Sequence, residues 1–262
     1  MRLLAILAFT PSLTGFVLLG KNKAKLPATP ESPEIEFIYD PNGEVPPLSS
    51  KDALLDGQYA NLSDQELFPI LLQIAVDQWN GVRGSYLRLK LVPATSTPER
   101  SRDDKLNVIL AERNTNASTA AFATPENNPD NADEISDCDI SVSLSGAKAT
   151  SMLETLTHEI GHCVGLGHPH NNYGAIMSYS RGGSSYKLGA DDKAGAIFLY
   201  PDPAYVDDKP KELIGCGNIG IEANVMYVTW MIVLLPLLAL TRKYRFTIGT
   251  HTKFMGKPTR PQ

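Results

Sequence analysis

Four of the five histidines in this 262-residue chain lie between residues 158 and 170, in the stretch THEIGHCVGLGHPH. His158 and His162 are four residues apart, so on a helix both rings project from one face and can bind the same ion. Glu159 lies beside the first histidine, and a carboxylate that is not itself a ligand can accept a proton from a metal-activated water. The spacing therefore predicts a zinc site that performs hydrolysis.

The residues that follow complete this pattern. Gly165 can adopt the left-handed conformation that ends a helix, which would bring His168 back toward the ion as a third nitrogen ligand. Three protein ligands leave one position for water, the catalytic arrangement, whereas four would close the site. We interpret His170, two residues further on, as a surface residue.

The segment 158–168 fits HExxHxxGxxH in full, and AIMSY at 175–179 resembles the Met-turn of the metzincin zinc endopeptidases. The resemblance, over about residues 35–203, implies that Met177 packs beneath the metal as a hydrophobic base. Tyr179 resembles the serralysin tyrosine that ligates the metal or stabilises the tetrahedral intermediate. LGADDKAGAIFLYP at 188–201 resembles the matrixins. The chain is thus similar to a matrixin with a serralysin-like Met-turn.

The family resemblance also implies a fold and a substrate-binding strand. The expected fold is α+β: a twisted, mostly parallel sheet with an antiparallel edge strand, an active-site helix and a C-terminal helix. TAAFATP at 119–125 is similar to the matrixin edge strand that pairs with an extended substrate. The residues along its rim are Ala120, Ala121, Phe122 and Ala123.

These features predict a monomeric zinc endopeptidase that cleaves peptide bonds of extended protein substrates, with Glu159 as general base. The same motif is also compatible with two other functions. One is a membrane-tethered zinc-binding or adhesion protein without hydrolysis, and the other is a zinc amidase that acts on cell-wall peptide.

Periodicity and end signals place the elements around this motif. Alternating apolar residues predict strands that begin near residues 35, 86, 105, 119 and 138. Ser63 and Glu66 form a capping-box pattern for a helix that ends near Gly81. The zinc helix is expected to begin at Thr150 or Ser151 as its N-cap. A last helix begins near Ala190.

The acidic stretch PENNPDNADEISDCD at 125–139 is interpreted as a solvated loop, because it lacks EF-hand spacing. Calcium bound by its oxygens is the weaker alternative. Cys138 lies in this stretch, and an exported protein permits a Cys138–Cys163 disulfide. Two free thiols are the other interpretation of the same residues.

Charge is distributed unevenly along the chain, whose net charge is −5. Residues 34–202 hold 24 acidic and 12 basic residues, while residues 242–262 hold six Lys or Arg and no acid. An acidic body lacks the basic face that binding to phosphates requires, which excludes a nucleic-acid partner.

The chain's ends predict an exported, membrane-anchored protein whose catalytic domain faces away from the cytoplasm. Residues 1–24 are expected to be a signal peptide or N-terminal anchor, with cleavage after Gly20 or Ala24. The catalytic domain is placed at 34–203 and a linker at 204–223. The uncharged run 224–241 precedes RKYR, which favours a membrane span or a processed sorting segment that follows Cys216, with 242–262 as a cytoplasmic tail.

Overall fold

The computed structural model describes residues 15–20, 23–54, 57–102, 104–113, 120–170, 172–179 and 186–206. All of them lie in the first of two compact units, Met1–Cys216. The predicted membrane segment 224–241 and basic tail 242–262 lie outside the described residues. Within the described ranges, no helix is both long and apolar enough to cross a membrane.

A five-stranded sheet carries the domain, in the order β4 (Arg88–Pro93), β2 (Glu34–Tyr39), β5 (Asn107–Glu112), β7 (Asn131–Ser143) and β6 (Ala121–Asn128). β2 pairs in parallel with β4 and β5, and β5 pairs in parallel with β7. β6 is antiparallel to β7 and forms one edge. The predicted mostly parallel sheet with an antiparallel edge strand is confirmed.

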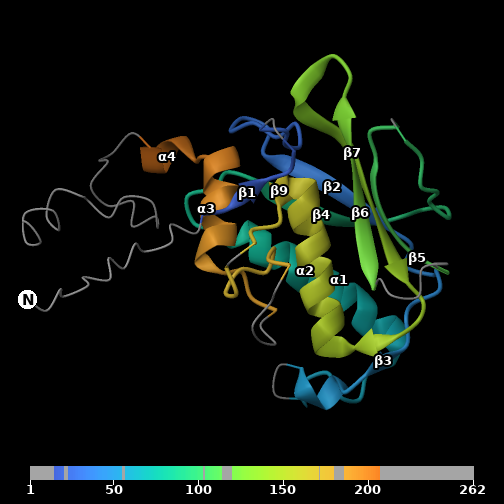
Figure 1. Cartoon of the computed structure of the whole chain (residues 1–262). Helices are drawn as coiled ribbons and strands as arrows, with labels where there is room; N and C mark the ends of the chain where they lie inside the picture. Colours follow the sequence, from blue (N-terminus) through green and yellow to red (C-terminus); the bar gives the residue numbers. More distant parts are fainter. Residues whose placement is uncertain are drawn as a thin grey trace, which may run out of the picture. The chain divides into compact units, whose positions relative to one another are not determined.

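Two long helices, α1 (Asp64–Asn80) and α2 (Ala149–Val164), pack on each other, and α2 runs beside β6 (Figure 1). α3 (Ala190–Leu199) and the short α4 (Pro203–Val206) follow, and α3 begins where the sequence predicts. Leucines of α1 and α2 are buried in one core with residues of β7. The α1–α2 pair therefore fixes α2 against the sheet edge.

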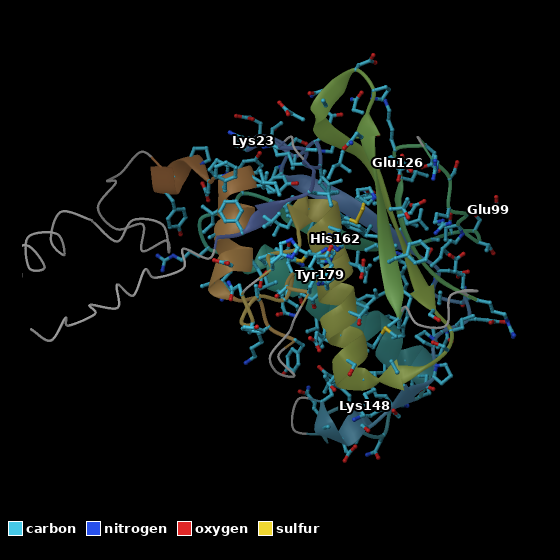
Figure 2. All side chains as sticks on the ribbon, viewed as in Figure 1. Lys23, Glu99, Glu126, Lys148, His162 and Tyr179 are labelled. Carbon is cyan, nitrogen blue, oxygen red and sulfur yellow. A yellow bond between two sulfur atoms is a disulfide. The ribbon has the colours of Figure 1, made fainter. Side chains whose placement is uncertain are left out.

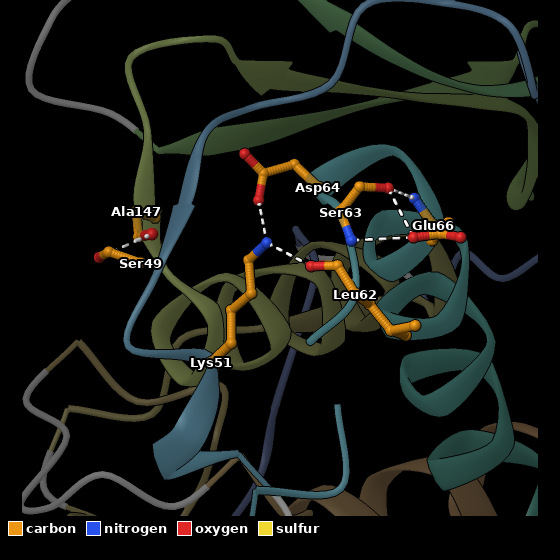
Figure 3. A network of polar contacts seen from close by, with 7 residues as sticks. All are labelled: Ser49, Lys51, Leu62, Ser63, Asp64, Glu66 and Ala147. Atoms are coloured by element: carbon orange, nitrogen blue, oxygen red, sulfur yellow. Dashed lines mark hydrogen bonds and ion pairs between the residues drawn. The ribbon is translucent and has the colours of Figure 1, made fainter. Parts of the chain in front are cut away.

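α1 begins with the predicted capping box, which Figure 3 shows from close by. Ser63 Oγ accepts a hydrogen bond from the Glu66 amide at 3.2 Å, and the Glu66 carboxylate accepts one from the Ser63 amide at 2.9 Å. Lys51, in the short 3-10 helix Lys51–Ala53, pairs with Asp64 at 2.6 Å. The helix ends at Gly81, as predicted, and continues through Pro69.

α2 begins earlier than expected. Its N-cap is Lys148, so the prediction of Thr150 or Ser151 was wrong. The cause is β8 (Ala147–Lys148), which pairs in parallel with β3 (Leu48–Ser49) and fixes the chain immediately before the helix. The other end agrees with the prediction, because Gly165 caps α2 with a left-handed φ of 110°.

The acidic stretch 125–139 is a long β-hairpin, and its prediction as a solvated loop was wrong. β6 continues to Asn128 and β7 starts at Asn131, with irregular register on either side of Asn127. Asp, Asn and Pro are poor strand formers on their own. Pairing with a neighbouring strand overrides that preference here.

The N-terminal segment joins the folded body. β1 (Val17–Leu18) pairs antiparallel with β9 (Leu166–Gly167), and the Leu19 amide donates to the Gly165 carbonyl at 2.8 Å. Ala24, Leu26 and Ala28 are buried. The body therefore starts before the predicted boundary at residue 34, and a cut after Gly20 or Ala24 would remove β1. Residues 1–14 lie outside the described ranges.

Cys138 and Cys163 form a disulfide with a Cα–Cα distance of 5.5 Å. Both side chains are fully buried. The bond joins β7 to the last turn of α2, so it attaches the helix that bears the histidines directly to the sheet.

Candidate metal centre

The three histidines of the sequence motif converge on one point. His168 Nε2 lies 3.0 Å from His158 Nε2 and 3.1 Å from His162 Nε2. Their ligand atoms all lie within 4.8 Å of one another, and no other such group of His, Cys, Asp or Glu occurs among the described residues. We refer to these three residues as the histidine cluster.

Main-chain carbonyls orient two of the rings. His158 Nδ1 lies 2.7 Å from the Ile176 carbonyl oxygen, and His162 Nδ1 lies 2.8 Å from that of Leu166. A nitrogen facing a carbonyl carries the proton, which leaves the Nε2 lone pair to bind an ion. Burial lowers the pKa of His162, which favours the neutral, ligating form. The donor set therefore fits a zinc ion.

Met177 packs against Gly161 of α2 and lies in a turn that Asp192 of α3 fixes. The Asp192 carboxylate accepts hydrogen bonds from the amides of Ile176 at 2.7 Å, Met177 at 3.2 Å and Gly189 at 2.7 Å. Burial raises the pKa of Asp192, and these three amides oppose that rise. Asp192 lies in the stretch 188–201, which the sequence marks only as a family feature. Its role in holding the turn that contains Met177 was missed.

Gly161, between the two helical ligands, allows Met177 to approach α2. A Cβ at this position would overlap the Met177 sulfur and the Trp79 ring. Met177 is only 1% exposed. The glycine at this variable position of HExxH is therefore a packing requirement in this fold.

Glu159 points to the edge strand and lies outside the set of three ligands. Its Oε2 accepts a hydrogen bond from the Ala123 amide at 2.8 Å, and the residue is 8% exposed. Ala121 and Ala123 lie in β6, with Phe122 between them and Ala120 immediately before the strand. The structure thus brings the predicted base next to the predicted substrate strand.

Tyr179 packs on the third histidine. The ring centroids of Tyr179 and His168 are 3.9 Å apart, and Tyr179 is 66% exposed. Figure 2 labels Tyr179 together with His162 of the histidine cluster. The His170 ring stacks on Tyr179, and the centroids of these two rings are 5.5 Å apart. His170 is exposed and is not part of the histidine cluster.

α1 supports the zinc helix through contacts that no sequence motif marks. Trp79 Nε1 donates to the Thr157 carbonyl at 3.0 Å. The Gln78 side chain donates to Thr157 Oγ1 at 3.1 Å and accepts from the Leu188 amide at 3.2 Å. One glutamine therefore connects α1, α2 and the segment before α3.

A second polar group, here named the acidic cluster, comprises the buried Asp137 and Asp139 and the exposed Asp104 beside them. Asp137 and Asp139 are 1% and 4% exposed. Burial, followed by the charge of Asp139, raises the pKa of Asp137 to about 7. Burial raises the pKa of Asp139 to about 6. Asp137 and Asp139 line a 250 Å³ cavity together with Arg100 and Arg102. Within the described ranges, these two aspartates are not part of a group that could hold a metal ion.

Residues 94–201 match the family model of the matrixins, peptidase family M10. These residues form a matrixin-like metzincin domain. The match runs from the end of β4 through α3 and contains the whole histidine cluster. A search of curated proteins gave no match.

Two solved structures show weak similarity to the chain that contains this matrixin-like domain. One is the GM1-bound form of the ECX AB5 holotoxin, with 10% identity, a TM-score of 0.43 and coverage of 73% of this chain and 91% of that chain. The other is a chaperone–substrate complex, with 13% identity, a TM-score of 0.33 and coverage of 64% and 34%. Neither similarity adds to the assignment.

Proposed function

We propose that the matrixin-like domain is a zinc endopeptidase that hydrolyses peptide bonds of extended protein substrates. One observation carries the proposal: three imidazole Nε2 atoms converge beside Glu159, whose carboxylate contacts the open edge of the sheet. The family match supports zinc metallopeptidase activity in general. The roles below follow from the positions of individual side chains.

His158, His162 and His168 would hold the ion. Zinc, when bound, would make a water molecule more acidic and polarise the substrate carbonyl. Glu159 accepts the proton of the attacking water and delivers it to the leaving amine. The Tyr179 ring, packed on His168, supports a role for its hydroxyl in stabilising the oxyanion.

The substrate is proposed to lie extended along β6. β6 is an edge strand, so its outward main-chain groups are available to pair with another chain. Main-chain pairing recognises the backbone of any extended peptide. Specificity for particular side chains would then come from pockets beside the strand.

The decisive experiment replaces Glu159 with glutamine, which preserves shape and removes the base. We expect kcat/KM on a casein-derived fluorogenic peptide to fall roughly 10²- to 10⁴-fold. Zinc content, measured by mass spectrometry of the purified protein, should remain one ion per chain. Glu154→Gln, on the same helix, is the matched control.

The outcomes separate the three readings of the motif. Unchanged cleavage by Glu159→Gln would reject the proposed mechanism. Zinc binding without chelator-sensitive hydrolysis of any peptide would instead support a binding or adhesion protein. Activity on peptidoglycan with none on casein would support the amidase.

We propose further that the protein is exported and anchored in a membrane through residues 224–241. The disulfide Cys138–Cys163 supports an oxidising compartment, and the uncharged run followed by RKYR supports the anchor. Mass spectrometry of the mature C-terminus tests this. A protein that ends near Cys216 would identify a processed sorting signal, whereas an intact tail would identify a permanent span.

A further inference from the structure

The pairing between β6 and β7 identifies which main-chain groups of β6 face outward. The Ser143 amide donates to the Ala120 carbonyl at 2.8 Å, so these two residues form a hydrogen-bonded pair. In an antiparallel ladder such pairs alternate with pairs whose amides and carbonyls point away from each other. Residues 122 and 124 therefore bond to β7. Ala121, Ala123 and Pro125 turn their main-chain groups outward.

Two independent contacts agree with this assignment. The Ala123 amide leaves the sheet and donates to Glu159. Cys138, which lies opposite Pro125, turns its amide away from β6 and donates to Asn107 Oδ1 at 3.0 Å. One member of each of these two non-bonded pairs thus points in the expected direction.

The outward-facing main-chain groups of β6 include few hydrogen-bond donors on the Pro125 side of Glu159. Proline has no amide hydrogen, so Pro125 can only accept through its carbonyl. At Ala123 the amide already contacts the Glu159 carboxylate, which marks the level of the reacting bond. Pro125 is the next outward residue, about 7 Å further along the strand.

We propose that Pro125 ends the substrate ladder, so that main-chain recognition on its side of the cleaved bond stops two residues from Ala123. There the substrate can donate one amide to the Pro125 carbonyl but receives no hydrogen bond in return. Beyond Pro125 the register of β6 becomes irregular at Glu126, Asn127 and Asn128, so lengthening the substrate past this point is expected to gain no further ladder bond. The inference rests on the proposed endopeptidase function and adds a residue that limits the binding site.

The test compares full-length wild-type protein with Pro125→Ala on one cleavable casein peptide and its truncations from each end. A restored amide adds one main-chain hydrogen bond, so kcat/KM for the full peptide should rise about two- to tenfold. The gain should disappear when the peptide is shortened on one side only. Thr124→Ala is the matched control, because the amide of residue 124 faces β7.

The results separate failure of the inference from failure of the proposed function. A wild-type protein that cleaves no peptide contradicts the endopeptidase proposal itself. A cleaving wild type whose Pro125→Ala variant gains nothing, or gains equally with peptides of every length, contradicts the role of Pro125. Thermal unfolding shows whether the variant is folded, and Pro125→Val is a second replacement that favours a strand.

A scan of N-methylated peptides on the wild-type protein needs no variant. Each methyl group removes one substrate amide as a donor. We expect loss of kcat/KM at the amide opposite Pro125 and no effect at amides further out on that side. The proposal would be overturned if N-methylation lowered kcat/KM equally far from the cleaved bond on both sides of the peptide.

Discussion

The histidine cluster and the acidic cluster each contain two buried residues, His158 and His162 in one and Asp137 and Asp139 in the other, but their polar atoms are satisfied in different ways. His158 and His162 each direct Nδ1 at a main-chain carbonyl, which leaves the Nε2 atoms to meet. In the acidic cluster, Asp137 Oδ2 has no hydrogen-bond partner within the described structure. The comparison indicates that backbone partners organise the histidine cluster for ion binding, whereas burial of Asp137 Oδ2 in the acidic cluster has a cost that no hydrogen bond to that atom offsets.

The two clusters lie on opposite faces of β7 and are connected by the disulfide. Cys138 lies between Asp137 and Asp139 in sequence, and its side chain faces α2, so those two carboxyl groups face the other side. Cys163 directly follows the ligand His162. The disulfide therefore links the strand that bears the two buried aspartates to the helix that bears His158 and His162.

The largest effect is expected when the histidine cluster itself is broken. His158→Ala removes one of three ligands, and peptide cleavage should fall by roughly three orders of magnitude with loss of zinc. Zinc content by mass spectrometry and kcat/KM on the same peptide measure this. His170→Ala, a histidine outside the cluster, should retain zinc. A His158→Ala protein that keeps both zinc and activity would show that the cluster is not the metal centre.

Asp192→Asn tests the support behind the cluster. The variant replaces a carboxylate that three amides share, one of which belongs to Ile176, whose carbonyl orients His158. We expect a loss of about 2–4 kcal/mol in the free energy of unfolding and roughly a 10- to 100-fold loss of zinc affinity. Urea unfolding and competition with a chelator measure the two quantities. A lower free energy of unfolding with unchanged zinc affinity would limit Asp192 to a structural role.

Replacing both cysteines, as Cys138→Ser with Cys163→Ser, tests the connection between the clusters. The two residues are 25 positions apart, and loss of such a crosslink should lower the free energy of unfolding by about 2–4 kcal/mol. Cys216→Ser, which leaves this pair intact, is the control. Equal stability of all three proteins would mean that packing alone holds α2 on the sheet.

The histidine cluster was predictable because its spacing is local. An i, i+4 pair on a helix and a glycine at its end determine where three rings can meet, whatever the rest of the chain does. Individual strands and the capping box at Ser63 were predictable for the same reason, since alternation and capping depend on near neighbours. The parallel order of the sheet was expected only from the family resemblance. Gln78 and Asp192 were not, because their partners lie far away in sequence and carry no pattern.

The failed predictions have one physical cause in common, which is strand pairing. β8 moved the start of α2, and pairing with β7 converted the acidic stretch into a hairpin. β3, the partner of β8, comes from a distant part of the chain, whereas β6 and β7 are consecutive strands. Local propensity cannot anticipate such pairs, because their stability depends on the partner.

The smallest expected effect concerns Asp137 in the acidic cluster. Its pKa is raised to about 7 from 3.8, so the folded protein holds this proton more tightly than the unfolded chain does. Between about pH 4 and pH 7 the unfolded carboxyl is ionised while the folded one is still protonated, so the free energy of unfolding falls as pH rises. Asp137→Asn should remove part of that slope and gain stability relative to wild type at pH 7. Urea unfolding at several pH values measures the difference between the two proteins, with the exposed Asp130→Asn as control. Parallel curves for wild type and Asp137→Asn would mean that an unseen partner, such as a bound cation, stabilises the carboxylate, and the contrast between the clusters would then disappear.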